Sequence, residues 1–398
     1  MRIGIIFNID KEALLSCFPL QTDKAEFGNY CVSYGAPAVN TLIHSFLQAG
    51  HFVRIFTLAQ RSFTIITDQI EIYATEVYNR YPIKYLWGTF TDAHALRKLM
   101  QGHLNDLDVL HAHWTYQNAY AALFYEKQIP VFCTVRDIAS YIWWIESVKN
   151  KVTWSFRVLM NWMVFRHKKK IHFIANSPYT AAIIKKKYHI DVPIIPNSIK
   201  DSFIKYDNHL SPKAFKILCI SSSNDKRKNV KALLYAFKTF RLRHPEATLQ
   251  LVGPPFVDGD TIIENWKHEG LLQQVELIGG IPHDKLVEYI DRCSIFVTPS
   301  LEETFGNTLL ESIVRKVPVI GGLHSGAVPY VLHHGEAGYL CDVSKPECIC
   351  QALEYVYSHP QEVANKAEEA YQIILSEYTE GIVCQKHIEL YKKFIIKN

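Results

Sequence analysis

Short runs of β-branched and other apolar residues alternate along this chain with longer stretches in which apolar residues recur at helical spacing. This alternation is typical of βαβ units, which place their strands in a parallel sheet. We therefore predict an α/β protein with two such sheets. The expected strands are 3–7, 52–57, 108–113, 130–135, 171–177 and 192–196 in the first half, and 215–221, 247–253, 274–280, 294–300 and 317–322 in the second. The expected helices are 36–50, 229–243, 260–270, 283–292 and 307–315.

A polar stretch in the middle of the chain, 197–213, contains turn-forming Asn residues and precedes a new strand. The chain has 398 residues, enough for two or three domains, and we place a boundary in this stretch. We expect doubly wound domains at 1–198 and 213–377, a linker at 199–212, and a final helix, 378–398, that packs back on the first domain. Because ligands bind such sheets at the carboxyl ends of the strands, we expect both sheets to face a central cleft.

Composition excludes several classes of protein. Apolar residues make up 48% of the chain, charged residues 21%, and the net charge is +4, as in an ordinary globular protein rather than a disordered one. No uncharged apolar stretch reaches the roughly 18 residues of a transmembrane helix, and the run 3–7 is too short for a signal-peptide core. The nine cysteines form no CxxC pair, so we expect no disulfide scaffold or zinc ribbon and place the protein in the cytoplasm.

The most informative motif is PSLEETFGNTLLES, residues 299–312, where a strand ends, a loop follows and a helix begins. Glu303 lies in the loop, and Glu311 follows about one turn inside the helix. The free N–H groups and positive end of a helix suit a phosphate, and each carboxylate can accept hydrogen bonds from two hydroxyls. Gly306 lets the backbone approach a ligand closely. The alternative is that one acid complements the helix dipole and the other is an ordinary surface glutamate.

This segment resembles the retaining GT-B glycosyltransferases of family four, whose hallmark is P-S-x-x-E-x-F-G-x-x-x-x-E. Other segments resemble the same family in the same order along the chain: 33–57, 194–203, 226–237, 317–320, 325–332 and 334–342. The resemblance implies two Rossmann-like domains, the second holding a nucleotide-diphosphate sugar and the first supplying the acceptor site. It also implies that no metal or other cofactor is needed.

Site residues follow from the resemblance, position by position. Glu303 would bind hydroxyls of the donor sugar, Glu311 would bind the ribose, and Lys228 would neutralise the diphosphate. A lysine suits that last task because its ammonium group is a compact charge. The other donor-binding positions that the resemblance implies are Phe305, Gly306, Asn307, Thr308, Ile281, Gly35 and Arg227.

Three positions depart from the family's pattern. Ser222 lies in the region where the family often has an arginine that grips phosphate, and Arg227 or Arg136 could supply that charge. Arg136 itself stands where the family commonly has a histidine beside the donor sugar. An arginine cannot act as a base, but it can donate hydrogen bonds to a hydroxyl or a phosphate, so we expect Arg136 to contact donor or acceptor. Tyr330 replaces a glutamate.

Two histidines end an expected strand, and we expect them to point to opposite faces of the sheet. His113, beside Trp114, is expected to reach the cleft and to contact donor or acceptor, whereas His111 is expected to be structural. Two D-x-D strings, 106–108 and 258–260, resemble the pair with which a metal-dependent transferase binds its cation. We interpret both as ordinary polar loops.

The implied function is that of a retaining, metal-independent hexosyltransferase. It would move a sugar from a UDP- or GDP-linked donor to a hydroxyl of a glycan or lipid-linked acceptor, in the synthesis of cell-surface polysaccharide. Two alternatives stay open: a catalytically lapsed protein that binds a nucleotide sugar or a partner enzyme, and a nucleotide-sugar-modifying enzyme such as an epimerase. We expect no nucleic acid partner.

Charge is distributed unevenly, which indicates an anionic partner for one half of the chain. Residues 1–200 carry 22 Lys and Arg against 14 Asp and Glu, and 141–190 carry ten basic residues and one acid. Because aromatic residues accompany these basic ones, we expect the first domain to attach to the anionic inner face of a membrane. The alternative is that 154–165 is a buried helix, polar only at Arg157 and Asn161, and that the lysines keep the domain soluble.

Overall fold

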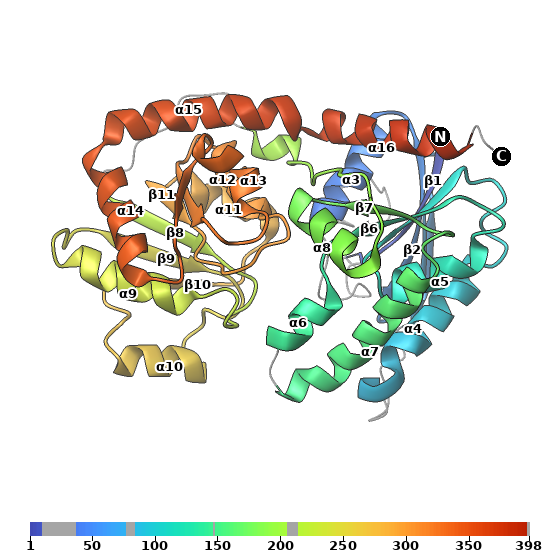
Figure 1. Ribbon diagram of the computed structural model, residues 1–398, viewed down its shortest axis with the longest axis horizontal. Coiled ribbons are helices and arrows are strands. Elements are labelled where there is room, and N and C mark those ends of the chain that lie inside the picture. Colours follow the sequence, from blue (N-terminus) through green and yellow to red (C-terminus); the bar gives the residue numbers. More distant parts are fainter. Residues whose placement is uncertain (10–36, 77–83, 146–147, 205–213, 396–398) are drawn as a thin grey trace. The chain divides into compact units, whose positions relative to one another are not determined.

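The computed structural model describes residues 1–9, 37–76, 84–145, 148–204 and 214–395, and it divides into two compact units (Figure 1). Unit 1 comprises Met1–Ser198 together with Glu380–Asn398, and unit 2 comprises Ile199–Thr379. Each unit is an α/β sandwich around one sheet, in agreement with the predicted fold class.

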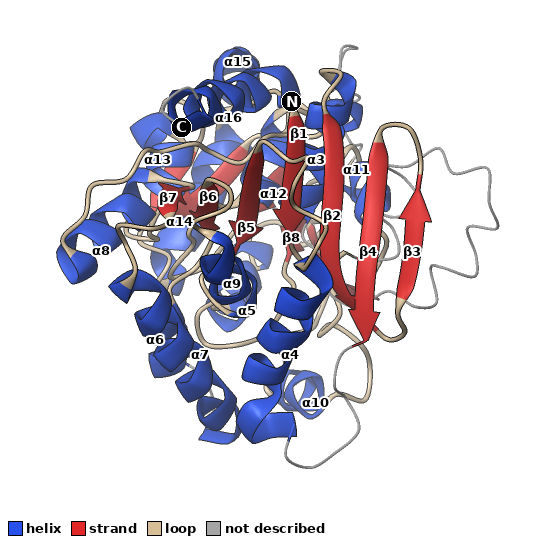
Figure 2. Ribbon diagram, turned by 90° about the vertical axis from the view of Figure 1, so that its right-hand side faces the viewer, coloured by secondary structure: helices blue, strands red, loops and turns tan. Residues whose placement is uncertain are grey.

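The sheet of unit 1 has the order β3-β4-β2-β1-β5-β6-β7 among the described residues, and only β3 and β4 pair in antiparallel fashion (Figure 2). The hairpin of β3 and β4 extends the predicted sheet at one edge. The expected strand 192–196 is wrong, because a single bridge between Ala175 and Ile194 is all that forms there. Pro193 and Pro196 have no N–H to donate to a ladder. The strands are β1 (Arg2–Ile6), β2 (Phe52–Ala59), β3 (Phe63–Ile66), β4 (Ile70–Glu76), β5 (Val109–His113), β6 (Val131–Val135) and β7 (His172–Ala175).

Helices cover both faces of this sheet. One apolar core lies under α3 and α16, and the other lies under α4, α5, α7 and α8. Ser177 starts α8 as its N-cap, with Pro178 at the first helical position, where its missing N–H costs nothing. The helices are α3 (Pro37–Gln48), α4 (Lys84–Met100), α5 (Gln117–Ala122), α6 (Ala139–Ile145), α7 (Val148–Arg166), α8 (Pro178–Tyr188) and α16 (Glu380–Ile395), with a 3-10 turn at Leu123–Tyr125.

Unit 2 has a fully parallel sheet of order β10-β9-β8-β11-β12-β13. The predicted strands are all present, and β13 is an addition. The strands are β8 (Lys216–Ile220), β9 (Thr248–Val252), β10 (Val275–Gly279), β11 (Ile295–Val297), β12 (Val319–Gly322) and β13 (Tyr339–Cys341). The helices are α9 (Val230–Arg241), α10 (Thr261–His268), α11 (Leu286–Ile290), α12 (Asn307–Ile313), α13 (Val328–Val331), α14 (Pro346–Ser358) and α15 (Pro360–Glu377).

The described part of the segment expected to be a linker, 199–204, belongs to the core of unit 2. Ile199, Phe203 and Ile204 are buried there against side chains of α11, α12 and α15. The last helix, α16, packs on α3 of unit 1 and contributes Val383 and Tyr391 to that unit's core.

Buried histidines connect α16 to the sheet of unit 1. His111 shares hydrogen bonds with Thr134 Oγ1 (2.8 Å) and with the Tyr391 hydroxyl (2.6 Å). The expectation that His111 and His113 point to opposite faces is wrong: their ring centroids are 4.3 Å apart, because residues two apart in a strand share a face. Burial lowers the pKa of His111 and His113 well below 6.5, and it lowers the pKa of His387, on α16, to about 4.

Unit 1 should lose stability when these histidines are forced to take up protons. The pKa of each is lower in the folded than in the unfolded state, so their contribution to stability is complete above pH 6.5 and is lost as pH falls below that value; for His387 the loss continues to about pH 4. We expect the free energy of unfolding to fall by up to about 1.4 kcal/mol per pH unit for each histidine. Urea unfolding followed by tryptophan fluorescence measures this, since six of the seven tryptophans belong to unit 1.

A His387→Gln variant tests whether this pH dependence comes from the buried histidines. Its unfolding free energy should depend less steeply on pH between 6.5 and 5 than that of the parent, whereas exposed His268→Gln should leave the slope unchanged. Identical slopes in all three proteins would contradict the assignment.

Candidate active site

Three loops of unit 2 carry most of the predicted site residues. They follow β8, β10 and β11, and because the strands are parallel, their carboxyl ends lie at one edge of the sheet. β8 and β11 are direct neighbours, so the loop containing Lys228 lies beside the loop containing Glu303.

The loop after β8 is held in place by side-chain caps. Asp225 Oδ1 accepts hydrogen bonds from the backbone N–H groups of Arg227 (2.9 Å) and Lys228 (3.1 Å). Asn229 adopts a left-handed conformation and donates its side-chain amide to the carbonyl oxygen of Pro299 (3.1 Å), which lies in the loop after β11. These bonds fix the backbone on which Lys228 is carried.

Lys228 and Glu303 form an ion pair, with Nζ and Oε1 2.6 Å apart and only 14% and 16% of the two side chains exposed. Burial alone would raise the pKa of Glu303. The charge and hydrogen bond of Lys228, together with nearby Arg227, outweigh it and hold the pKa below its ordinary value. Glu303 is therefore a carboxylate at neutral pH, able to accept further hydrogen bonds at its second oxygen.

Glu311 lies in α12 and is 5% exposed. Its Oε1 lies 2.8 Å from Nε2 of His283, and its Oε2 is buried with no hydrogen-bond partner among the described residues. A buried carboxylate oxygen without a partner is costly, so this atom is ready for a ligand hydroxyl. His283 was not predicted from the sequence.

The turn between β11 and α12 can contact a ligand through its backbone N–H groups rather than through side chains. Gly306 has a φ of 97°, which a residue with a Cβ rarely adopts, and α12 begins at Asn307 directly after it. The Phe305 side chain is buried in the core of unit 2, so its predicted contact could come only from its amide. Thr308 lies in the first turn of α12, and Ile281 lies in the loop after β10.

The remaining predicted residues belong to unit 1. Arg136, directly after β6, donates Nε–H to Nδ1 of His113 (3.2 Å) and a terminal N–H to Oδ1 of Asn197 (2.7 Å). Burial lowers the pKa of Arg136 to about 10, which leaves it cationic at neutral pH. His113 is fully buried, so it supports Arg136 and does not itself reach the surface.

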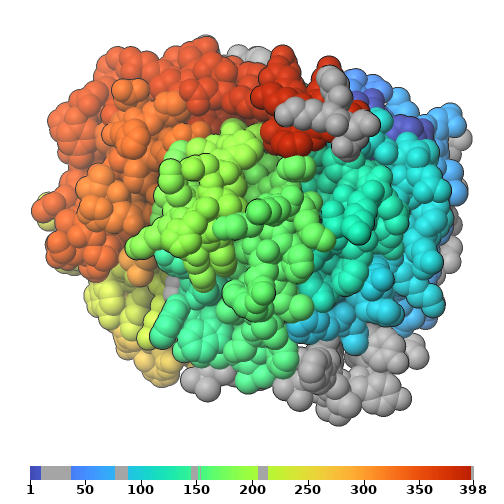
Figure 3. Space-filling model, turned by 45° about the vertical axis from the view of Figure 1, so that its right-hand side comes forward, coloured from blue at the N-terminus to red at the C-terminus, as the bar shows by residue number. Residues whose placement is uncertain are grey.

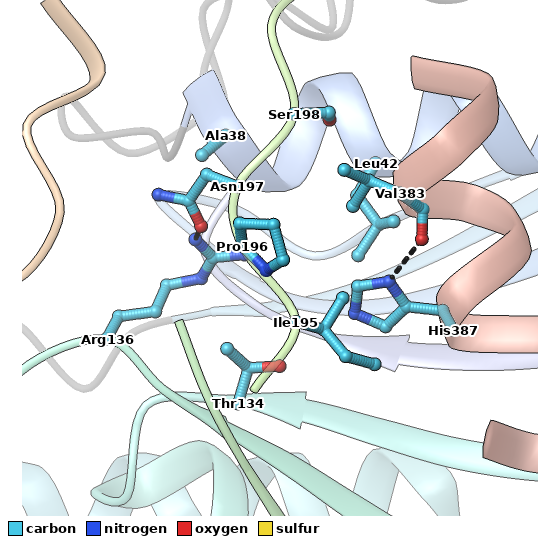
Figure 4. Close-up of a pocket in the computed structure, with 10 residues that line it drawn as sticks. All are labelled: Ala38, Leu42, Thr134, Arg136, Ile195, Pro196, Asn197, Ser198, Val383 and His387. Atoms are coloured by element: carbon cyan, nitrogen blue, oxygen red, sulfur yellow. Dashed lines mark hydrogen bonds between the residues drawn. The ribbon is translucent and has the colours of Figure 1, made fainter. Parts of the chain in front are cut away.

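Arg136 lines a small cavity in unit 1 of about 10 Å³, room for about one water molecule (Figure 4). Thr134, Asn197 and Ser198 add polar groups to its wall, and His387 contributes from α16. Gly35, predicted to approach the phosphates, lies outside the described residues.

The two D-x-D strings have structural roles. Asp106 pairs with Arg2 and Arg54, and Asp260 caps the start of α10. The described residues contain no group of three or more His, Cys, Asp or Glu side chains arranged to hold a metal ion. Across the described ranges, no helix combines the length and apolar character needed to span a bilayer.

Two family models match this chain, one in each half. Residues 202–373 match the family described as Glycosyl transferases group 1, and residues 38–203 match Glycosyltransferase Family 4. N-acetyl-alpha-D-glucosaminyl L-malate synthase from Bacillus anthracis is 30% identical over 43% of this chain and 44% of that protein. The gpi3 subunit of phosphatidylinositol N-acetylglucosaminyltransferase from Schizosaccharomyces pombe is 28% identical over 35% of this chain and 30% of that protein. The chain thus aligns with less than half the length of these relatives.

Solved structures with low sequence identity share the fold. Sucrose-phosphate synthase from Thermosynechococcus elongatus matches over 100% of both chains, with a TM-score of 0.77 and 16% identity. HepE from Anabaena, in complex with UDP-glucose, matches over 99% of this chain and 100% of that chain, with a TM-score of 0.69 and 15% identity. The two family models together span 38–373, in the order of the two units. The chain therefore belongs to the group 1 glycosyltransferases of the family 4 type, and its two α/β units have the GT-B fold.

Proposed function

We propose that this protein transfers a sugar from a nucleotide-diphosphate donor to a hydroxyl of a glycan or lipid-linked acceptor, with retention at the sugar carbon and without a metal. The observation that carries the proposal is a pair of carboxylates at one edge of the unit 2 sheet: Glu303, which is largely buried and paired with Lys228, and Glu311, which is buried and paired with His283. Carboxylates accept hydrogen bonds from sugar and ribose hydroxyls, and the ammonium group suits a diphosphate.

In the proposed reaction, the bond between the sugar carbon and the diphosphate oxygen breaks while the acceptor hydroxyl forms the new bond on the same face. Negative charge develops on the departing diphosphate, where Lys228 would stabilise it, and the diphosphate would take the acceptor's proton. No protein base is required, so an arginine at position 136 is compatible with this chemistry. Arg136 would hydrogen-bond donor or acceptor.

The names of the relatives suggest which donors to test first. The Bacillus anthracis and Schizosaccharomyces pombe relatives are both named for N-acetylglucosaminyl compounds, and the Anabaena structure holds UDP-glucose. UDP-N-acetylglucosamine and UDP-glucose are therefore the first donors, with the GDP-sugars next. Donor consumption with and without acceptor separates a transferase from an epimerase, which needs no acceptor, and from a lapsed binder, which consumes nothing.

Replacing the two glutamates should have different effects on the enzyme. Glu303→Gln should mainly lower kcat, and Glu311→Gln should mainly weaken binding of the nucleotide, measured by calorimetry with UDP and GDP. A hydrogen bond to a charged group contributes about 1.5–3 kcal/mol, so losses of roughly 10- to 100-fold are expected. Exposed Glu369→Gln on α15 is the control. Parent-like binding and turnover in both variants would contradict the assignment.

Arg136→Gln should lower turnover about tenfold or more, because it removes a charged donor while keeping an amide for Asn197. Steady-state kinetics and thermal unfolding should be measured on the same preparations, since Nδ1 of His113 loses its partner. Arg157→Gln on α7 provides the control. Unchanged kcat and KM in Arg136→Gln would show that the guanidinium only supports the structure.

We further propose that unit 1 attaches to an anionic membrane through one face of α6 and α7, the α6–α7 surface. The exposed side of α7 repeats at helical spacing through Val152, Leu159 and Trp162, and Trp144 of α6 is 75% exposed. α7 is therefore buried on one face only, through Met160, Val164 and Phe165. Asn161, expected in a polar stripe, is instead buried and donates to Thr115 Oγ1.

Figure 3 shows in green the surface formed by the segment that contains α7 and α8, and basic side chains follow α7 and end α8. The exposed lysines 168–170 follow α7, and the exposed lysines 185–187 end α8. The two groups are close together, because Lys168 Nζ donates to the carbonyl oxygen of Tyr188 (2.7 Å). Exposed tryptophan beside clustered lysine suits an anionic headgroup layer.

Sedimentation with liposomes tests this attachment. Binding should require anionic lipid and weaken with salt, and Lys168–Lys170→Ser should reduce it on the order of a hundredfold at low salt, from about 1 kcal/mol per lysine. Replacing three exposed lysines of α16, Lys386, Lys392 and Lys393, removes the same charge as a control and should change little. Equal binding to neutral vesicles, or none to anionic ones, would contradict the proposal.

A further inference from the structure

His283 connects the loop after β10 to helix α12, which belong to separate sequence motifs. It follows Ile281 and Pro282 in the loop after β10, and its ring lies against Phe203, with centroids 5.0 Å apart. Its Nε2 reaches Oε1 of Glu311, 28 residues further along the chain, at 2.8 Å. About a quarter of the His283 side chain is exposed.

The hydrogen bond has a definite direction. In the proposed function Glu311 acts as a carboxylate, which can only accept, so Nε2 of His283 is the donor to Oε1. Glu311 is buried, and this bond holds Oε1 of its carboxylate in place. Because Oε1 is held, Oε2 is the oxygen left to accept a hydrogen bond, and it is buried without a partner among the residues that the structure describes.

We propose that His283 is a positioning residue of the nucleotide site: it orients the Glu311 carboxylate so that Oε2 accepts a hydrogen bond from a hydroxyl of the donor's ribose. This inference rests on the proposed function, which gives Glu311 the ribose. His283 would thereby tie the loop containing Ile281 to the ribose-binding helix α12. Its effect should appear in nucleotide affinity rather than in kcat.

Affinity for two ligands that differ only in the ribose isolates this role. UDP and GDP are titrated calorimetrically, and the tighter of the two is compared with its 2′,3′-dideoxy form. The variants are His283→Phe, which keeps a ring against Phe203 but has no donor, and His283→Gln, which keeps a donor. Exposed His268→Phe is the matched control, and thermal unfolding checks that each variant is folded.

In the parent, the ribose hydroxyls should strengthen binding, and His283→Phe should reduce that advantage about tenfold. His283→Gln should restore most of it, and His268→Phe should keep it all. Affinity for the dideoxy nucleotide should stay the same throughout. A similar loss for both nucleotides would mean a general disruption of the site and would overturn the proposal.

Glu311→Gln separates this inference from the one it rests on. If that variant loses the preference for ribose while His283→Phe keeps it, His283 does not position Glu311 and this inference alone is overturned. If Glu311→Gln also keeps the preference, Glu311 does not bind ribose, and the proposed function loses that residue as well.

Discussion

The ion pair of Lys228 and Glu303 depends on the order of strands in unit 2. The two residues are 75 positions apart and meet because β8 and β11 are parallel neighbours. Each charge is largely buried, and burying a lone charge costs several kcal/mol. The attraction within the pair offsets this cost for both residues. The loops on both sides are then fixed by backbone bonds, one through Asp225 and the other through a bridge between Glu303 and Gly326.

Unit 1 holds its partly buried cation, Arg136, differently. Two acceptors of the Arg136 guanidinium, Nδ1 of His113 and Oδ1 of Asn197, are uncharged atoms. These neutral acceptors orient the guanidinium, and the charge of the adjacent Asp137 favours its cationic form. His113 can accept only while it is neutral, and its burial keeps it so.

The sequence predicted what depends on local pattern. Parallel strands, the turn at Gly306 and the positions of Glu303 and Glu311 follow from apolar periodicity and one continuous motif. The prediction of a strand at 192–196 was wrong because the two prolines there outweigh the β-branched residues. His283 could not be predicted, since its importance comes from a partner brought near by the fold, and nothing in Ile-Pro-His itself indicates it. The same holds for Asn161, a polar residue that the fold buries and pairs.

The placement of α16 has a consequence for the order in which the chain folds. Unit 2 is one continuous segment, but unit 1 takes its final core residues from a helix synthesised after the whole of unit 2. During synthesis unit 2 can therefore close its core while unit 1 still lacks Tyr391, the partner of His111. The contacts between α3 and α16 are more than 300 residues apart in sequence and carry a large loop-closure entropy. Unit 1 should therefore be the slower of the two units to fold.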